Sequence, residues 1–298
     1  MVAETHGNFA GKRLIVFGCG YIGGEIARQA VARGMRVTGL TRNPVKAEVW
    51  RKSGIEMIIA DLAARGWHED IAGGADFVLN CVSSGGGGIA GYRRSYVEGM
   101  DSVLTWARDR GAVGTLVYTS STSVYSQDGG VTVDEHAPAG GDERADVLLA
   151  AETRLRQNGA ACLRWFVLRL AGIYGPERHH LLEQVRSGEI RGRGEPRLNL
   201  VHRDDITAAV WGCFSASPAI ANQIFNVADD GARPKAEVVA WLAARLGAPA
   251  PRFTGVPGAG RRSVAPDRII ANAKLKAALG WQPRYPTFRE GYDSLLSR

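Results

Sequence analysis

The stretch that decides the fold runs from Lys12 to Pro44 and reads KRLIVFGCGYIGGEIARQAVARGMRVTGLTRNP. Residues 14–17 form a short apolar run without polar alternation, which is typical of a strand buried on both faces of a parallel sheet. Glycines follow in the pattern GxGxxG, and a helical pattern of apolar residues then ends at Gly34. Residues 35–40 are a second apolar run. This order predicts a βαβ unit in which the glycine loop joins the first strand to the helix.

Each glycine of the loop has a physical role in a dinucleotide site. Gly18 allows the tight turn out of the strand, Gly20 lets the backbone approach a pyrophosphate, and Gly23 lets the helix pack on the sheet. The helix from about Ile22 then points its N–H groups and positive dipole end at the phosphates. Tyr21 also lies inside the motif, and it is predicted to bind the cofactor together with Gly18, Gly20, Ile22 and Gly23. A glycine-rich connection that binds nothing is the alternative interpretation.

The end of the second strand predicts which cofactor is bound. An NAD site usually has an acidic residue there, which accepts hydrogen bonds from the ribose hydroxyls. This chain instead has Thr41-Arg42-Asn43-Pro44. The Arg42 guanidinium offers a planar fork of donors suited to a 2′-phosphate. We therefore expect NADP rather than NAD, although Arg42 could also be an ordinary solvated arginine.

Composition sets limits on the class of protein. The chain has 298 residues, of which 45% are hydrophobic and 22% charged, as in a globular protein of one large or two modest domains. A net charge of +7 favours a small anionic substrate or a dinucleotide, and no motif for nucleic acid appears. The four cysteines are scattered, no signal peptide is evident, and no apolar run is long enough to span a membrane. We therefore expect a cytoplasmic protein.

Strands and helices alternate through the first half of the chain, which predicts an α/β fold of the Rossmann-like, doubly wound parallel type. Further strands are expected at 55–60, 75–82, 115–119 and 162–170, with helices at 45–53, 92–110 and 144–157. In such sheets, ligands bind at the carboxyl ends of the strands. The residues predicted to bind the cofactor at these ends are Arg42, Asp61, Leu62, Cys81, Val82, Ser83, Thr119, Ser120 and Ala171.

The alternation of strands and helices becomes less regular in the second half of the chain. We expect residues 1–171 to form the cofactor domain, with 199–230 returning to it, and 172–198 with 231–298 to form a smaller C-terminal substrate-binding lid. Asp204 or Asp205 is expected to cap a helix, and Asp229-Asp230 to form a solvated turn. Residues 85–88 are interpreted as a mobile loop beside the nicotinamide or as a plain flexible turn. His179-His180 lacks partners at ligand spacing, so no metal site is predicted.

Seven short motifs, taken in order, resemble the extended short-chain dehydrogenase/reductase superfamily, the NAD-dependent epimerase/dehydratase group. They are GCGYIG from Gly18, DL from Asp61, SSTSVY from Ser120, RLAGIYGP from Arg169, VHRDD from Val201, NVAD from Asn226 and LGWQP from Leu279. The resemblance implies that the first aspartate lies at the adenine, that residues after the fourth strand line the nicotinamide, and that Ser121 polarises the substrate oxygen. It also implies a second domain that holds the substrate, often a nucleotide sugar, and a dimer formed through helices 92–110 and 144–157.

The chain departs from that family at the acid/base pair. The family carries Tyr-x-x-x-Lys on the helix after the fifth strand, four residues before a glutamate. When that glutamate is matched to Glu152, Leu148 stands at the lysine position and Arg144 at the tyrosine position. Tyr96 stands where the family has its active-site asparagine. The chain therefore looks like the atypical branch of the superfamily.

Three interpretations of function follow. The first is an NAD(P)-dependent oxidoreductase acting on a carbonyl or hydroxyl group, in which Ser121 binds the reacting oxygen and Tyr96, Tyr125 or Tyr174 donates the proton. The second is a catalytically inactive NADP-binding regulatory protein. The third is an epimerase or dehydratase of nucleotide sugars with a tightly held cofactor. The sequence names no particular substrate.

Overall fold

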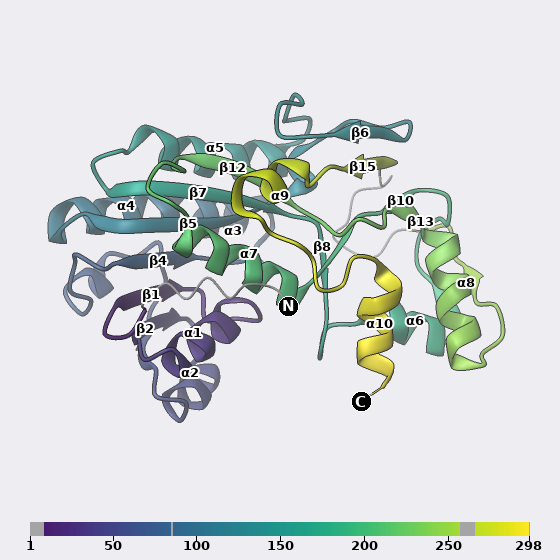
Figure 1. Ribbon diagram of the computed structural model, residues 1–298, viewed down its shortest axis with the longest axis horizontal. Helices are drawn as coiled ribbons and strands as arrows, with labels where there is room; N and C mark the ends of the chain where they lie inside the picture. The colour runs from purple at the N-terminus through teal and green to yellow at the C-terminus, as the bar shows by residue number, and fades with distance from the viewer. Residues whose placement is uncertain (1–8, 85, 257–265, 298) are drawn as a thin grey trace. The chain divides into compact units, whose positions relative to one another are not determined.

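The computed structural model describes residues 9–84, 86–256 and 266–297. Its main element is a seven-stranded sheet with the order β12-β7-β5-β4-β1-β2-β3, and the pairs from β5 through β4, β1 and β2 to β3 are parallel (Figure 1). The strands are β1 (Arg13–Phe17), β2 (Arg36–Thr41), β3 (Glu56–Ile59), β4 (Phe77–Asn80), β5 (Val113–Ser121), β7 (Cys162–Leu170) and β12 (Gln223–Val227). The predicted α/β fold of the Rossmann-like, doubly wound type is confirmed.

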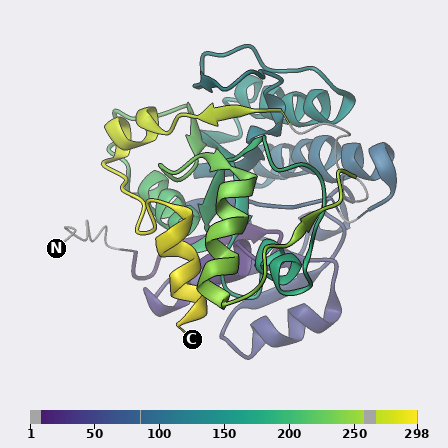
Figure 2. The same ribbon diagram turned by 90° about the vertical axis from the view of Figure 1, so that its right-hand side faces the viewer.

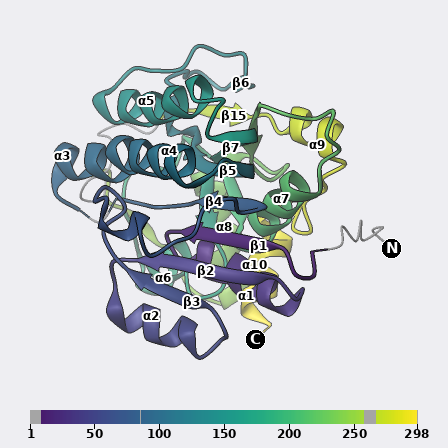
Figure 3. The same cartoon turned by 90° about the vertical axis from the view of Figure 1, so that its left-hand side faces the viewer.

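Helices cover both faces of this sheet. They are α1 (Gly23–Ala32), α2 (Pro44–Arg51), α4 (Gly99–Arg110), α5 (Glu143–Gln157) and α7 (Arg203–Ser215). A continuous apolar cluster joins α4 and α5 to buried residues of β1, β4, β5 and β7. The opposite side carries α1 and α7, where Trp211 donates its indole N–H to Gln29 at 2.7 Å. Figure 3 shows α4 and α5 apart from α1 and α7 across the strands.

The helix predicted over residues 92–110 is interrupted. Helix α3 (Gly88–Arg93) leads into one π-helical turn at Arg94–Glu98, and α4 begins only at Gly99. The N–H of Gly99 donates to the carbonyl of Arg94, five residues back, instead of four. The single helix was therefore a wrong prediction. The predicted loop 85–88 includes Gly85, which lies outside the described residues, and Gly88 already belongs to α3.

The chain divides into two compact units. The first holds residues 1–124, 139–169 and 207–225, and the second holds 125–138, 170–206 and 226–298. Residues 125–138 join the second unit because β6 (Val131–Val133) pairs with β15 (Arg268–Ile270). Within the segment 199–230, residues 207–225 group with the first unit, and 199–206 and 226–230 group with the second. That one unit binds cofactor and the other binds substrate stays a prediction.

The second unit is built of small sheets and helices. Its further elements are β8 (Gly172–Tyr174), α6 (His180–Arg186), β9 (Glu189–Ile190), β10 (Arg197–Leu198), β11 (Leu200–His202), β13 (Arg233–Pro234), α8 (Lys235–Leu246), β14 (Arg252–Phe253), α9 (Ala273–Leu279) and α10 (Phe288–Leu296). Its apolar core gathers α6, α8 and α10, and the rings of Trp241 and Phe288 meet edge-on at 5.4 Å. Figure 2 shows α8 in light green beside α10 in yellow.

Candidate active site

The glycine loop lies where the strand order reverses, between β1 and β4. The N–H of Cys81 donates to Phe17 O at 2.9 Å, so the chain segments leaving the two strands stay together. Gly18 has a φ of +93°, and a Cβ there would lie 2.8 Å from the backbone N of Val82. A Cβ at Gly23 would lie 2.3 Å from Gly18 O. The loop is therefore packed as tightly as the Rossmann motif requires.

Gly20 differs from these two glycines because space opens beside it. A Cβ at Gly20 would meet no atom closer than Gly18 O, which is 4.0 Å away. Helix α1 begins at Gly23, and Ile22 occupies its N-cap position without a side-chain cap. Backbone N–H groups at an uncapped helix start, next to an open glycine, fit the pyrophosphate of a dinucleotide.

Two cysteines hold this loop in place. The Cys81 Sγ–H donates to Gly18 O at 3.1 Å, and the carbonyl of Cys19 accepts the indole N–H of Trp50 at 3.1 Å. Burial raises the pKa of the Cys19 thiol to about 12 and that of Cys81 further still. Both side chains are therefore neutral structural groups. Tyr21 and Val82 are half-buried and Ser83 is exposed.

Arg42 follows β2 directly and is exposed. The next residue, Asn43, caps α2 by accepting the Lys46 N–H at 3.0 Å, which fixes the direction of the chain at this point. Asp61 lies within electrostatic reach of Arg42 and pairs with Arg94 Nε at 2.9 Å. Burial raises the pKa of Asp61, but the Ala63 N–H and Arg94 outweigh it, so the pKa is lowered. The Asp61 carboxylate is thus charged, and Leu62 beside it is buried.

The end of β5 carries three hydroxyl side chains with different surroundings. Thr119 and Ser120 are buried, and Ser120 Oγ donates to Glu152 at 2.6 Å. Glu152 on α5 is also held by Arg169, so the Ser120 side chain anchors α5 to the sheet. Ser121 is half-buried, and its Oγ accepts the Ser123 N–H at 3.1 Å. Because an oxygen that accepts from this turn keeps its own proton, the Ser121 O–H can donate to a ligand.

The residues that stand at the positions of the family's lysine and tyrosine both lie on α5. Leu148 is buried in α5, and Arg144 is exposed in the first turn of this helix. The guanidinium of Arg144 lies 5.8 Å from the ring centre of Tyr92. Tyr92 and Tyr96 face each other with ring centres 4.6 Å apart, and Tyr96 Oη accepts the Ser84 N–H at 3.3 Å. Tyr96 is half-buried and lies on the π-helical turn.

The other two candidate tyrosines belong to the second unit and are buried. Tyr125 has no exposed surface, and its hydroxyl donates to Asn226 Oδ1 at 2.9 Å. Tyr174 is 3% exposed and packs on Tyr292 and on the backbone of Gly291. A hydroxyl enclosed in this way does not reach a substrate, so the structure does not support either residue as the proton donor. Ala171, also in this unit, is buried and donates its N–H to Val227.

Asp229 was expected in a solvated turn, and this prediction is wrong. The residue is 5% exposed, and its Oδ2 has no hydrogen-bond partner among the described residues. Burial is the main cause that raises its pKa to about 8; Asp230, Asp205 and Glu290 also raise it, and the Gly231 N–H lowers it. Asp229 is therefore a protonated carboxylic acid at neutral pH. The apolar residues Val227 and Ala228 just before it were the available sequence signal.

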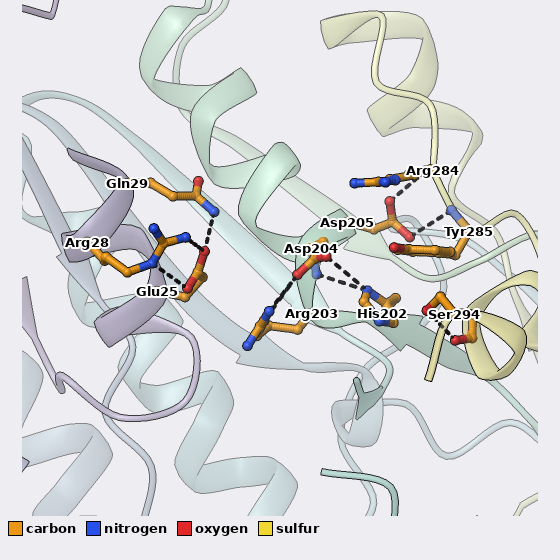
Figure 4. Close-up of polar contacts among 11 residues, drawn as sticks. Glu25, Arg28, Gln29, His202, Arg203, Asp204, Asp205, Arg284, Tyr285 and Ser294 are labelled. Carbon is orange, nitrogen blue, oxygen red and sulfur yellow. Dashed lines mark hydrogen bonds and ion pairs between the residues drawn. The ribbon is translucent and has the colours of Figure 1, made fainter. Parts of the chain in front are cut away.

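The start of α7 is fixed by His202 rather than by an aspartate, which corrects the predicted cap. His202 Nδ1 accepts the Asp204 N–H at 3.2 Å (Figure 4). Asp205 instead accepts the N–H groups of Arg284 and Tyr285, at 2.6 and 3.2 Å, and so fastens the C-terminal segment to α7 within this unit. Its pKa is raised to about 6, mainly by burial. These residues of the VHRDD motif are structural.

Residues 9–84, 86–256 and 266–297 contain no cluster of three His, Cys, Asp or Glu side chains that could hold a metal ion, although His179 and His180 both contact Glu183. Within the same residues, no helix is long and apolar enough to cross a bilayer. Arg197 pairs with Asp267 at 2.6 Å.

The family model described as "NAD dependent epimerase/dehydratase family" matches residues 14–228. The chain therefore belongs to the NAD-dependent epimerase/dehydratase family, as its motifs suggested. This places it among NAD(P)-dependent epimerases, dehydratases and reductases.

Individual relatives are distant. Protein YeeZ of Escherichia coli K12 is 27% identical over 92% of this chain and 97% of its own length. A 3-diazoavenalumate denitrifying reductase from a Streptomyces species is 29% identical over 66% of this chain and 70% of its own. The structure of MoeE5 in complex with UDP-glucuronic acid and NAD is 20% identical, has a TM-score of 0.80, and covers 95% of this chain and 97% of its own, a likeness of fold alone.

Proposed function

We propose that this chain is an NADP-dependent reductase of a small carbonyl compound, with Ser121 and Tyr96 as its catalytic residues. The observation that carries the proposal is the Ser121 hydroxyl at the carboxyl end of β5. Its oxygen accepts the Ser123 N–H, and its own O–H remains available to donate to a carbonyl oxygen. The relative named as a reductase supports this class of reaction.

The residues of the glycine loop would hold the cofactor, which supplies a hydride to the carbonyl carbon when it is bound. Gly20 is the residue beside which the diphosphate would fit, since the loop is open only there among Gly18, Gly20 and Gly23. As negative charge develops on the substrate oxygen, Ser121 would stabilise it by a hydrogen bond. Tyr96 would supply the proton, because it is the one of the three candidate tyrosines that is half-buried.

The preference for NADP rests on Arg42. Arg42 is exposed at the end of β2, and the described residues include no ion-pair partner for it. The nearby carboxylate of Asp61 is instead paired with Arg94. A free guanidinium at this place favours a 2′-phosphate over the ribose hydroxyls of NAD.

The test is a turnover assay with NADPH and NADH against a panel of aldehydes, ketones and nucleotide sugars. The proposal expects NADPH oxidation with a carbonyl substrate, and a loss of about 10²–10³ in kcat for Ser121→Ala. Tight NADPH binding without turnover of any compound would favour the regulatory alternative. Release of tightly bound NAD(P) on denaturation, with a nucleotide sugar as substrate, would favour the epimerase or dehydratase alternative.

A further inference from the structure

The family's tyrosine/lysine pair lets a tyrosine exchange its proton near neutral pH, and this chain lacks it. Any tyrosine that replaces the pair therefore needs other groups to stabilise its phenolate. The first unit holds such groups around Tyr96. They come from three separate segments: the loop after β4, helix α3 and the first turn of α5.

The Tyr96 oxygen receives two hydrogen bonds from these segments. The Ser84 N–H donates to it at 3.3 Å, and the Tyr92 side chain hydrogen-bonds to it. Burial raises the pKa of Tyr96, and these two hydrogen bonds oppose that rise by stabilising the phenolate. A phenol oxygen has two acceptor sites and one proton. A Tyr96 oxygen that accepts from both groups keeps its own proton available for donation to a substrate. The π-helical turn keeps both rings together, with their centres 4.6 Å apart.

Tyr92 in turn faces a cation. Arg144 lies 5.8 Å from the centre of the Tyr92 ring. Burial and Tyr96 raise the pKa of the Tyr92 hydroxyl, and Arg144 opposes that rise. The other groups that face this pair are Tyr118 on β5 and Asp142 before α5, and Tyr118 in turn lies near Glu152 on α5. Burial and these neighbours leave the pKa of Tyr92 at about 12, so it carries its proton under ordinary conditions. A protonated Tyr92 is able to donate to Tyr96.

We propose that Tyr92 and Arg144 are positioning residues that let Tyr96 act as the proton donor in place of the missing tyrosine/lysine pair. This inference rests on the proposed reductase function. When the carbonyl carbon has gained a hydride, Tyr96 transfers its proton to the carbonyl oxygen, which becomes a hydroxyl. The Tyr96 phenolate then takes the Tyr92 proton, and Tyr92, which is half-buried, regains a proton from solvent. The side chain of Arg144 stabilises the phenolate on Tyr92 between these last two transfers.

The experiment measures tyrosine ionisation in the protein without cofactor. All eight tyrosines are replaced by 3-fluorotyrosine, a phenol that ionises at lower pH, and ¹⁹F NMR signals are followed during a pH titration. The Tyr96 and Tyr92 signals are assigned by their loss in Tyr96→Phe and Tyr92→Phe. We expect Tyr92→Phe to raise the Tyr96 pKa by about one unit, because one hydrogen bond to the phenolate is lost. Tyr292→Phe, in the second unit, should leave it unchanged.

Arg144→Gln tests the cation without disturbing packing, since Arg144 is exposed. It should raise the pKa of Tyr92, whereas Arg156→Gln, an exposed arginine at the other end of α5, should not. Identical Tyr96 titrations with and without the Tyr92 hydroxyl would overturn the inference, as would identical Tyr92 titrations in wild type and Arg144→Gln.

Turnover then separates this inference from the proposed function. If NADPH oxidation occurs, Tyr96→Phe should lower kcat by about 10²–10⁴, and Tyr92→Phe should move the alkaline limb of its pH profile. Full activity in Tyr96→Phe would refute the role of Tyr96 alone. Coupled titrations in a protein that oxidises no NADPH would refute the reductase function while leaving the coupling of the two tyrosines intact.

Discussion

Arg169 on β7 donates two hydrogen bonds to Glu152 on α5, from Nη2 to Oε2 at 2.6 Å and from Nε to Oε1 at 3.1 Å. Both side chains are almost fully buried, at 6% and 2% exposure. The same carboxylate accepts the Ser120 hydroxyl. The pair therefore fixes α5 against the end of β5, directly beside Ser121.

Removing one member of this pair should destabilise the protein strongly. Glu152→Ala is expected to lower the free energy of unfolding by about 3–5 kcal/mol, because Arg169 would remain buried without its partner. Arg154→Ala removes the exposed pair of Arg154 with Asp101 on neighbouring helices and should cost about 0–1 kcal/mol. Urea unfolding measures both values. Equal losses for the two variants would show that the buried pair has no special role in stability.

The buried acid Asp229 should make stability depend on pH. Its folded-state pKa of about 8 lies above the ordinary value of 3.8, chiefly because of burial. Between these values the folded state binds more protons than the unfolded state, so the free energy of unfolding should fall as pH rises from about 4 to about 8. Melting temperatures across this window measure the slope.

Asp229→Asn provides the comparison, because an amide cannot ionise. The variant should lose less stability than the wild type between pH 5 and pH 8, whatever its stability at pH 5. If wild type and variant show parallel slopes across this window, Asp229 is ionised in the folded protein and its assignment as a neutral acid is wrong.

Gly20→Ala should separate cofactor binding from folding. A Cβ there would meet no protein atom closer than 4.0 Å, so the melting temperature should stay close to that of the wild type. The same Cβ would occupy the space proposed for the diphosphate and should weaken NADPH binding about tenfold or more. Gly66→Ala, where a Cβ would also meet nothing within 4 Å, is the control and should bind normally. Unchanged affinity in Gly20→Ala, measured by equilibrium dialysis, would place the dinucleotide elsewhere.

Arg42→Ala should reduce the preference for NADPH over NADH. A charge-assisted contact with the 2′-phosphate is worth about 1.5–3 kcal/mol, so the NADPH affinity should fall about ten- to a hundredfold while that for NADH changes little. Arg33→Ala, an exposed arginine at the end of α1, is the control. Fluorescence titrations measure the affinity of the wild type and of both variants for NADPH and for NADH. A wild-type protein that binds both nucleotides equally would contradict the role given to Arg42.

The sequence predicts the large sheet well because its strands are apolar runs punctuated by glycine. The glycine loop and the loss of the tyrosine/lysine pair could also be inferred from the sequence, since both depend on residues a few positions apart. The π-helical turn was not, because one extra residue in a helical turn leaves the spacing of apolar residues almost unchanged. The neutral state of Asp229 and the pair of Glu152 with Arg169 depend on elements distant in the chain, which only the folded structure brings together.

The most direct test of this account is calorimetric titration of the purified chain with NADPH and NADH. The account predicts saturable binding of NADPH at a single site, tighter than that of NADH, through the loop of Gly18, Gly20 and Gly23. Absence of heat with oxidised and reduced forms of both nucleotides would contradict it.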